Sequence, residues 1–257
     1  MNSDDPFDRD NLRQAEHLLM AQDIAISYFQ GELYDRQGCR LTGISITRPD
    51  GTTIQLDEAE TGRLFMIPDG STVWARKVTE HGKVPSGLNV MSNNPLIAKG
   101  EHTSVIAFRD EAGTSLGIDA LYIRRLILAA NAPERLATVS FGIMAVAAYR
   151  LGFGHIELFA GGNGPIVLDD PDRFVGFAVW PKFGFDAALD FAELNAAASE
   201  TLRTCKTVQD VIDTDPAWWT ALGRGRQMRF DLSAGSRSWR ILLNFLFDVL
   251  PMPEIKP

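Results

Sequence analysis

The pattern of apolar and polar residues in the middle of the chain predicts a β-strand, a helix and a second strand in succession. Residues 121–129 form a largely apolar run that is typical of a strand. From Pro133 onward apolar side chains recur at helical spacing, and Gly152 is expected to end this helix because glycine enters the left-handed conformation without a steric penalty. Residues 155–160 have the composition of the next strand. This order is a βαβ unit, which predicts parallel strands joined by a right-handed crossover.

The chain before this unit has the pattern of one helix followed by antiparallel hairpins. Apolar residues recur at helical spacing between Asp10 and Phe29. Alternating segments then flank turns rich in Pro, Asp and Gly. The expected hairpins pair residues 41–47 with 52–56 across the turn at 48–51, and residues 62–67 with 71–78 across the turn at 68–70. Residues 80–101 are rich in Gly, Pro, Asn and Ser, which predicts a surface loop and a domain boundary. We therefore expect an N-terminal helix and β-meander over residues 1–100, and an α/β core with C-terminal helices over residues 101–257.

The segments that follow complete an α+β fold. The expected elements are a hairpin of residues 103–109 and 114–119, a short helix capped by Asp170 or Asp172, helices over 189–203 and over 207–222 with a break at Pro216, and a strand over 228–232. The last helix, residues 236–250, is hydrophobic nearly all round and is therefore expected to be buried. The predicted fold class is α+β, with a mixed central sheet flanked by helices.

Composition places the chain among ordinary globular proteins. It has 257 residues, of which 45% are hydrophobic and 23% charged, and only two cysteines. No apolar run reaches the roughly 20 residues of a membrane span, and the acidic first residues do not resemble a signal peptide, so we expect a cytoplasmic protein that makes no use of a membrane. The net charge is −8, and residues 1–70 hold 13 acidic against 6 basic side chains. This balance argues against a general nucleic-acid binder. The acidic region is either a solvated surface or a contact for a basic protein partner.

His155 and Glu157 are the first candidates for chemistry. They lie two residues apart on a predicted strand and therefore share one face. A histidine and a glutamate at this spacing are suited to proton transfer, and the alternative is a polar strand face turned to solvent. A zinc deaminase would also need a Cys-x-x-Cys partner, which the sequence lacks, and the other histidines have no ligand spacing, so we expect no metal.

A second candidate is the arginine-rich stretch between Arg224 and Arg240. It has five arginines against one acid, and several glycines. Guanidinium groups on such a segment are typical of phosphate or carboxylate binding. The alternative is internal pairing with the acidic N-terminal region.

From about Val105 to Phe185 the order of elements resembles the GNAT-type acyltransferases. In that family a hairpin leads into a central strand, followed by a phosphate-binding loop, a helix, a splayed strand and a closing Gly-Phe segment. Here the central strand corresponds to residues 123–128, the helix end to Leu151-Gly152-Phe153 and the closing segment to residues 180–185. The resemblance covers roughly a third of the chain.

The resemblance implies a CoA-dependent N-acyltransferase that acts on an amine of a small molecule or protein, with acetyl-CoA or another acyl-CoA as the acyl donor. The family pattern assigns its ligand contacts as follows: pantetheine to the backbone of Leu126, Ile127 and Leu128, and pyrophosphate to Arg135, Thr138 and Ser140. Glu157 or His155 would be the base.

Two departures from the family pattern lead to a second hypothesis. Thr138 and Ser140 stand where the family has small glycines, and Trp180 stands where many members have an acidic tyrosine, so that Tyr122 or Tyr149 would have to serve. The alternative function is therefore a non-catalytic partner-binding protein on a degenerate acyltransferase scaffold.

Overall fold

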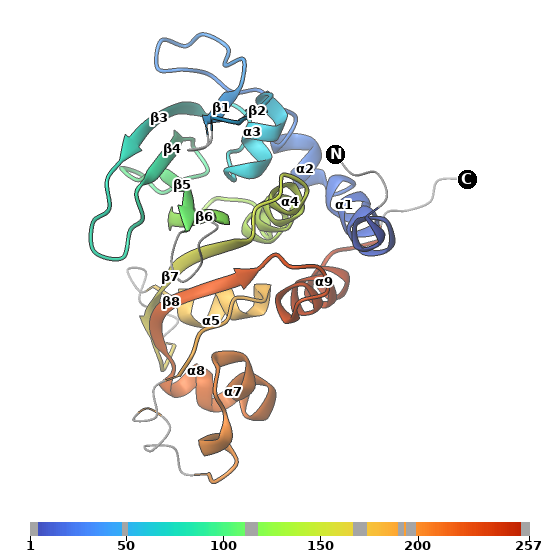
Figure 1. Cartoon of the computed structure of the whole chain (residues 1–257), viewed down its shortest axis with the longest axis vertical. Coiled ribbons are helices and arrows are strands. Elements are labelled where there is room, and N and C mark those ends of the chain that lie inside the picture. The colour runs from blue at the N-terminus through green and yellow to red at the C-terminus, as the bar shows by residue number, and fades with distance from the viewer. Residues whose placement is uncertain are drawn as a thin grey trace. The chain divides into compact units, whose positions relative to one another are not determined.

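The computed structural model describes residues 5–47, 51–110, 118–166, 174–189, 193 and 199–252 (Figure 1). The chain divides into two compact units. The first unit comprises residues 1–156, 232–235 and 246–257, and the second comprises residues 157–231 and 236–245. The division falls after Ile156, and the expected boundary at residue 100 lies inside the first unit.

An antiparallel meander of four strands forms the sheet of the first unit. Its strands are β3 (Thr72–Val78), β4 (Gly87–Asn93), β5 (Thr103–Asp110) and β6 (Ile118–Arg125). Strand β5 confirms the first strand of the hairpin expected at 103–119, and β6 pairs with it from Ile118. The expected turn and most of the second expected strand, at residues 111–117, lie outside the described residues. A separate hairpin of β1 (Ile44–Thr47) and β2 (Thr53–Leu56) confirms the first predicted pair of strands, and its turn at residues 48–50 is also outside the described part.

Strands β7 (His155–Asn163) and β8 (Arg224–Asp231) follow β6 in the strand order β3-β4-β5-β6-β7-β8 of a six-stranded sheet. The N–H of Gly154 donates to the C=O of Asp119 at 2.8 Å. This bond joins the residue before β7 to the second residue of β6, so the two strands start side by side, as parallel strands do. The predicted α+β class with a mixed sheet and flanking helices is therefore confirmed.

The helices of the first unit gather around α4 (Leu136–Arg150), which α1, α2 and α3 contact (Figure 1). The predicted helix at 10–29 is a π-helical turn η1 (Asp8–Leu12), α1 (Arg13–Met20) and α2 (Asp23–Tyr28). Nearly every residue of α4 is buried. A Cβ at Gly142 would lie 2.8 Å from a methyl group of Leu19, so this glycine permits close packing between α1 and α4.

Two predictions in the first hundred residues are wrong. The strand expected at 62–67 is instead α3 (Glu58–Leu64), because Asp57 and Glu60 form a capping box in which each side chain accepts the other's backbone N–H. The loop expected at 80–101 contains β4, a central strand paired on both sides. Asn89 and Ser92 of this strand are buried within the sheet, where their side chains are hydrogen-bonded to the neighbouring strand.

Two boundaries of the βαβ unit also differ from the prediction. Strand β6 ends at Arg125 instead of Ala129. Helix α4 begins at Leu136 instead of Pro133, because Arg135 has a left-handed backbone conformation, with φ of 69°, that cannot belong to a right-handed helix. Gly152, with φ of 78°, follows the last turn of α4 as predicted.

In the second unit, short helices and an aromatic cluster pack beside β8. The helical elements are α5 (Gly176–Val179), η2 (Trp180–Phe183), η3 (Leu202–Thr204), α7 (Val208–Thr214) and α8 (Pro216–Leu222). Helices α7 and α8 confirm the predicted helix with a break at Pro216. The caps expected at Asp170 or Asp172 and most of the helix expected at 189–203 lie outside the described residues.

The aromatic cluster links consecutive rings at centroid distances of 5.3–5.7 Å. It runs from Trp180 through Phe185 and Phe230 to Trp239, which belongs to α9 (Arg237–Val249). The expectation that this last helix is buried nearly all round is wrong: Trp239 and Leu242 are buried, but Arg240 and Phe247 are exposed, so the helix is amphipathic. None of the helices that the structure describes is long and apolar enough to cross a membrane.

The predicted Pro68–Gly70 turn is present and is fixed by its aspartate. The carboxylate of Asp69 accepts three backbone N–H groups, from Gln30 at 2.7 Å, Gly31 at 2.8 Å and Glu32 at 2.9 Å. These bonds hold the turn against the segment that follows α2. They replace the hairpin contacts that the sequence pattern predicted for this turn.

Replacing Asp69 by Ala is expected to lower the free energy of unfolding by about 3 kcal/mol, because three backbone donors lose an ionised acceptor. Urea denaturation monitored by circular dichroism measures this loss. Glu80→Ala, at an exposed carboxylate of the same unit, is the control and should change stability by less than about 0.5 kcal/mol. An equal effect of the two substitutions would contradict the role given to Asp69.

Candidate functional site

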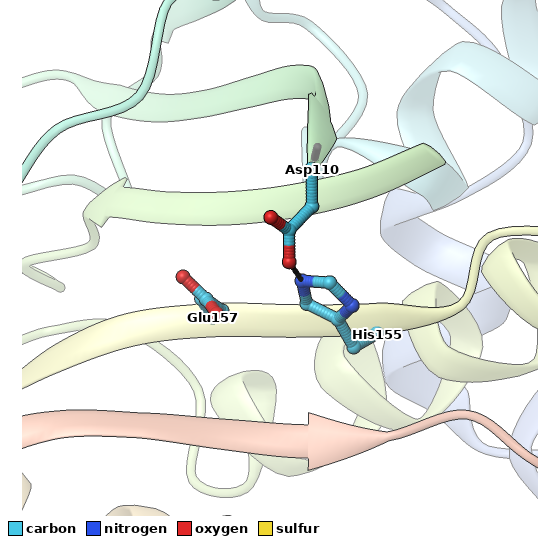
Figure 2. A group of neighbouring side chains, drawn as sticks. All are labelled: Asp110, His155 and Glu157. Carbon is cyan, nitrogen blue, oxygen red and sulfur yellow. Dashed lines mark ion pairs between the residues drawn. The ribbon is translucent and has the colours of Figure 1, made fainter. Parts of the chain in front are cut away.

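An imidazole and a carboxylate meet inside the first unit. His155, the first residue of β7, places its Nε2 atom 3.4 Å from Oδ2 of Asp110 at the end of β5 (Figure 2). The two side chains are 5% and 16% exposed. The ring of Phe108 meets the imidazole edge-on at a centroid distance of 6.0 Å. The alternative that His155 belongs to a strand face turned to solvent is therefore wrong.

This pair has the elements of a proton-transfer centre. The distance is longer than an ordinary N–H···O hydrogen bond but within the range of an ion pair, so the contact strengthens when the imidazole is protonated. The Asp110 carboxylate faces Nε2 and therefore orients this ring nitrogen as the hydrogen-bond donor. Asp110 gave no signal in the sequence, because its proximity to His155 depends on pairing between strands far apart along the chain.

Glu157 lies two residues after His155 on β7 and belongs to the second unit. Its carboxylate is held by β8: Oε1 accepts from Nε and Nη2 of Arg229 at 2.9 and 2.5 Å, and Oε2 accepts from the side-chain amide of Gln227 at 3.0 Å. Both oxygens thus have donors in the second unit. To accept a proton from a substrate, Glu157 would have to give up one of these hydrogen bonds.

The two tyrosines considered as general acids are in different surroundings. Tyr122 lies on β6 opposite Ile106 and is 4% exposed. The Tyr149 hydroxyl, at the end of α4, donates to the Asp5 carboxylate. Burial and this hydrogen bond raise the pKa of Tyr149 to about 12, so it releases its proton less readily than an ordinary tyrosine.

The segment after β6 offers unused backbone groups. Residues 126–129 continue as extended chain, and there the Ile127 C=O accepts from the Ala98 N–H at 3.0 Å and the Ala129 N–H donates to Leu96 at 2.9 Å. Backbone groups alternate between the two edges of an extended segment, so those of Leu126 and Leu128 point away from residues 96–98. Within the described residues the N–H and C=O of Leu128 make no hydrogen bond.

The N-terminus of α4 is also uncapped. The Leu136 N–H donates to Pro133 and the Val139 N–H to Arg135, but the N–H groups of Ala137 and Thr138 have no acceptor in the described part of the chain, and no side chain caps the helix. The Ser140 hydroxyl donates back to the Ala137 C=O at 3.2 Å, whereas none of the described residues is bonded to the Thr138 hydroxyl. This end of a 15-residue helix can therefore attract an anion.

The arginine-rich stretch is largely paired, but not with the partners that we considered. Arg226 binds Glu193 at 2.6 Å, Arg229 binds Glu157, and Arg237 binds Asp210 and Asp213 at 2.7 and 2.8 Å, all within the second unit. Acids of the N-terminal region pair instead with arginines of the first unit, as Asp8 and Glu16 do with Arg150. The expected pairing between the arginine stretch and the acidic N-terminal region is therefore not found among the described residues.

A cavity of about 400 Å³ in the second unit contains one further perturbed carboxylate. Burial raises the pKa of Asp186, although its Oδ1 accepts the N–H groups of Ala187 and Gln209 at 2.8 and 3.0 Å. Arg237 lies 4.0 Å from the same carboxylate and favours its ionised form only weakly. The sequence pattern did not single out Asp186, since its burial depends on the packing of α7 and α9.

Comparisons of the chain with protein-family models, with curated proteins and with solved structures found no match.

We expect Asp186 to make stability fall with rising pH. A raised pKa in the folded state means that folded Asp186 binds a proton more tightly than unfolded Asp186, so its contribution is lost as pH rises from about 4, the ordinary aspartate value, through the raised value. Asp186→Asn keeps an oxygen acceptor but does not titrate. The free energy of unfolding of Asp186→Asn, relative to the wild type, should therefore increase over this pH range. A difference that stays constant or decreases would contradict the assignment.

Proposed function

We propose that this protein is a CoA-dependent N-acyltransferase that transfers the acyl group of acetyl-CoA or another acyl-CoA to an amine of a small molecule or protein. One observation carries the proposal: an extended segment whose backbone groups at Leu126 and Leu128 have no hydrogen-bond partner among the described residues leads directly to an uncapped helix N-terminus at Leu136. The extended segment and this helix N-terminus both belong to the first unit. The resemblance in element order from β5 through β7 to the GNAT-type fold is in accord with the proposal.

The extended segment suits the amide-bearing arm of the donor. Pantetheine contains two amides, and a free strand edge pairs with an extended amide chain much as it pairs with another strand. Leu126 and Leu128 would supply this pairing with backbone N–H and C=O groups. Ile127 faces the opposite edge, where its C=O is already bonded to Ala98.

The helix N-terminus suits the pyrophosphate. The N–H groups of Ala137 and Thr138 and the positive end of the α4 dipole would face the negative charge. Arg135 is exposed immediately before the helix and adds a cation, and the Thr138 hydroxyl adds a donor where a glycine would offer only its backbone. Ser140 would contribute least, since its hydroxyl is bonded to Ala137.

Proton transfer is proposed for His155, with Glu157 as the alternative base. The acyl donor supplies a thioester carbonyl that an amine attacks. The imidazole of His155 would take the proton that the amine nitrogen loses as the C–N bond forms, and Asp110 would stabilise the resulting imidazolium. As the C–S bond breaks, the departing thiolate takes up a proton. Tyr122 is the candidate donor of that proton, since Trp180 has no usable acid and Tyr149 is bonded to Asp5.

Acetyl-CoA at 100 times its dissociation constant should stabilise the protein by about 2.7 kcal/mol, visible as a rise in melting temperature. Ala137→Glu should abolish this rise. Its carboxylate is favourable in the first turn of a helix, so the fold is preserved, but it repels the pyrophosphate. Ala137→Gln is the matched neutral control and should retain most of the shift. Equal shifts in both variants, or no shift in the wild type, would contradict the proposed site.

His155→Asn should lower kcat for acyl transfer by about 10²–10⁴-fold, the usual contribution of a positioned general base, while leaving the acetyl-CoA shift intact. Glu157→Gln is the comparison. If Glu157→Gln abolishes transfer and His155→Asn does not, Glu157 is the base and the role of His155 is wrong. If no amine accepts an acyl group, the partner-binding hypothesis takes the place of the enzyme.

A further inference from the structure

The first unit has a basic cavity away from the segment assigned to CoA. Its volume is about 350 Å³, and its lining includes Arg76 and Lys77 of β3, Arg124 of β6, and Val78, His81 and Val84. None of the described residues that line it carries a carboxylate. Two arginines and a lysine thus surround one small space in a protein whose overall charge is −8.

These three cations have no acidic partner among the described residues, which distinguishes them from their neighbours on the same sheet. Arg109 lies 3.5 Å from Asp119, and Arg125 lies 2.5 Å from Glu101. Like charges held together without counterions raise the electrostatic potential of the cavity, so an anion entering it gains energy from all three.

The strand register explains how β3 and β6 contribute to one cavity. Direct strand pairing aligns one residue from each of β3, β4, β5 and β6 in a row across the sheet. In this order the residues are Arg76, Asn89, Ile106 and Tyr122. Directly paired residues share a face of the sheet, so Arg76 lies on the same face as Tyr122, which is two residues before Arg124. A bulge where Ser104 pairs with Arg125 but Val105 pairs with Ile123 leaves Arg124 as the extra residue of β6.

Asn89, in the middle of this row, lies in the interior of the sheet and is not part of the lining of the cavity. It is fully buried, and its Oδ1 accepts from the Ser104 hydroxyl at 2.8 Å. Its Nδ2 has no hydrogen-bond acceptor in the described part of the chain. A buried amide donor without an acceptor is costly, so Asn89 is a polar position in the sheet that the described residues satisfy only in part.

We propose that this cavity binds a small molecule that carries a phosphate or pyrophosphate group. Two guanidinium groups match the paired oxygens of a phosphate, and Lys77 adds a point charge. The valine side chains supply an apolar wall, and the volume is that of a small-ligand pocket. The proposal does not depend on the acyltransferase function, since it uses none of the residues assigned to CoA.

The test is titration of the full chain with pyrophosphate by calorimetry at constant ionic strength. The wild type should bind pyrophosphate saturably, and the double variant Arg76→Gln/Arg124→Gln should bind at least tenfold more weakly. Both arginines are exposed, so the double variant should fold. The matched control is Lys99→Gln/Lys206→Gln, which removes two exposed charges outside the cavity and should bind as the wild type does.

Further variants separate this site from the one proposed for CoA. The Arg76→Gln/Arg124→Gln variant should keep its stabilisation by acetyl-CoA, and Ala137→Glu should keep its binding of pyrophosphate. If Ala137→Glu alone removes pyrophosphate binding, the anion site is the helix N-terminus and the proposal for the cavity is overturned. Absence of saturable binding, or equal weakening in the lysine control, also overturns it.

Discussion

The burial of α4 is the constraint on which the first unit depends. Nearly all of its residues are covered, and α1, α2 and α3 contact it. A buried helix still has to satisfy backbone groups at its two ends. At the C-terminal end the Leu151 and Phe153 N–H groups close the last turn on Ala147 and Ala148. At the N-terminal end, which follows the left-handed Arg135, two N–H groups have no acceptor in the part of the chain that the structure describes, so this end of α4 can accept an anion.

The same constraint explains the position of the extended segment before the helix. Strand β6 pairs with β5 as far as Arg125, and the chain then pairs with residues 96–98 on one edge only. The unused edge at Leu126 and Leu128 and the unused donors at Ala137 and Thr138 belong to one continuous stretch of backbone. Their arrangement depends on main-chain geometry and not on side-chain type. The proposed site therefore does not require the glycines of the GNAT pattern, in place of which this chain has Thr138 and Ser140.

Local patterns predicted the fold where local chemistry decides it. Gly152 marked the end of α4, Pro216 marked the break between α7 and α8, and the alternating pattern identified β1, β2, β3 and β5. The prediction failed where distant contacts decide the structure. β4 looked like a loop because Asn89 and Ser92 find their side-chain partners only on a neighbouring strand. The strand expected at 62–67 is an exception, because the capping box of Asp57 and Glu60 that begins α3 is a local signal that the prediction did not use.

The candidate sites follow the same rule. His155 and Glu157 could be selected from their spacing, but Asp110, Arg229 and Gln227 could not, because strand pairing brings them close. The cavity of Arg76 and Arg124 depends on the register of four strands and left no motif in the sequence. Thus the reactive side chains were visible in the sequence, whereas their partners became visible only in three dimensions.

A two-dimensional amide NMR titration with CoA, with backbone resonances assigned, tests the proposed CoA site most directly. If CoA binds there, the N–H signals of Leu126, Leu128, Ala137 and Thr138 shift together and saturably, and that of Ile127 changes less. If CoA shifts none of these signals, or shifts signals elsewhere and leaves these in place, the extended segment and the α4 N-terminus do not form a CoA site.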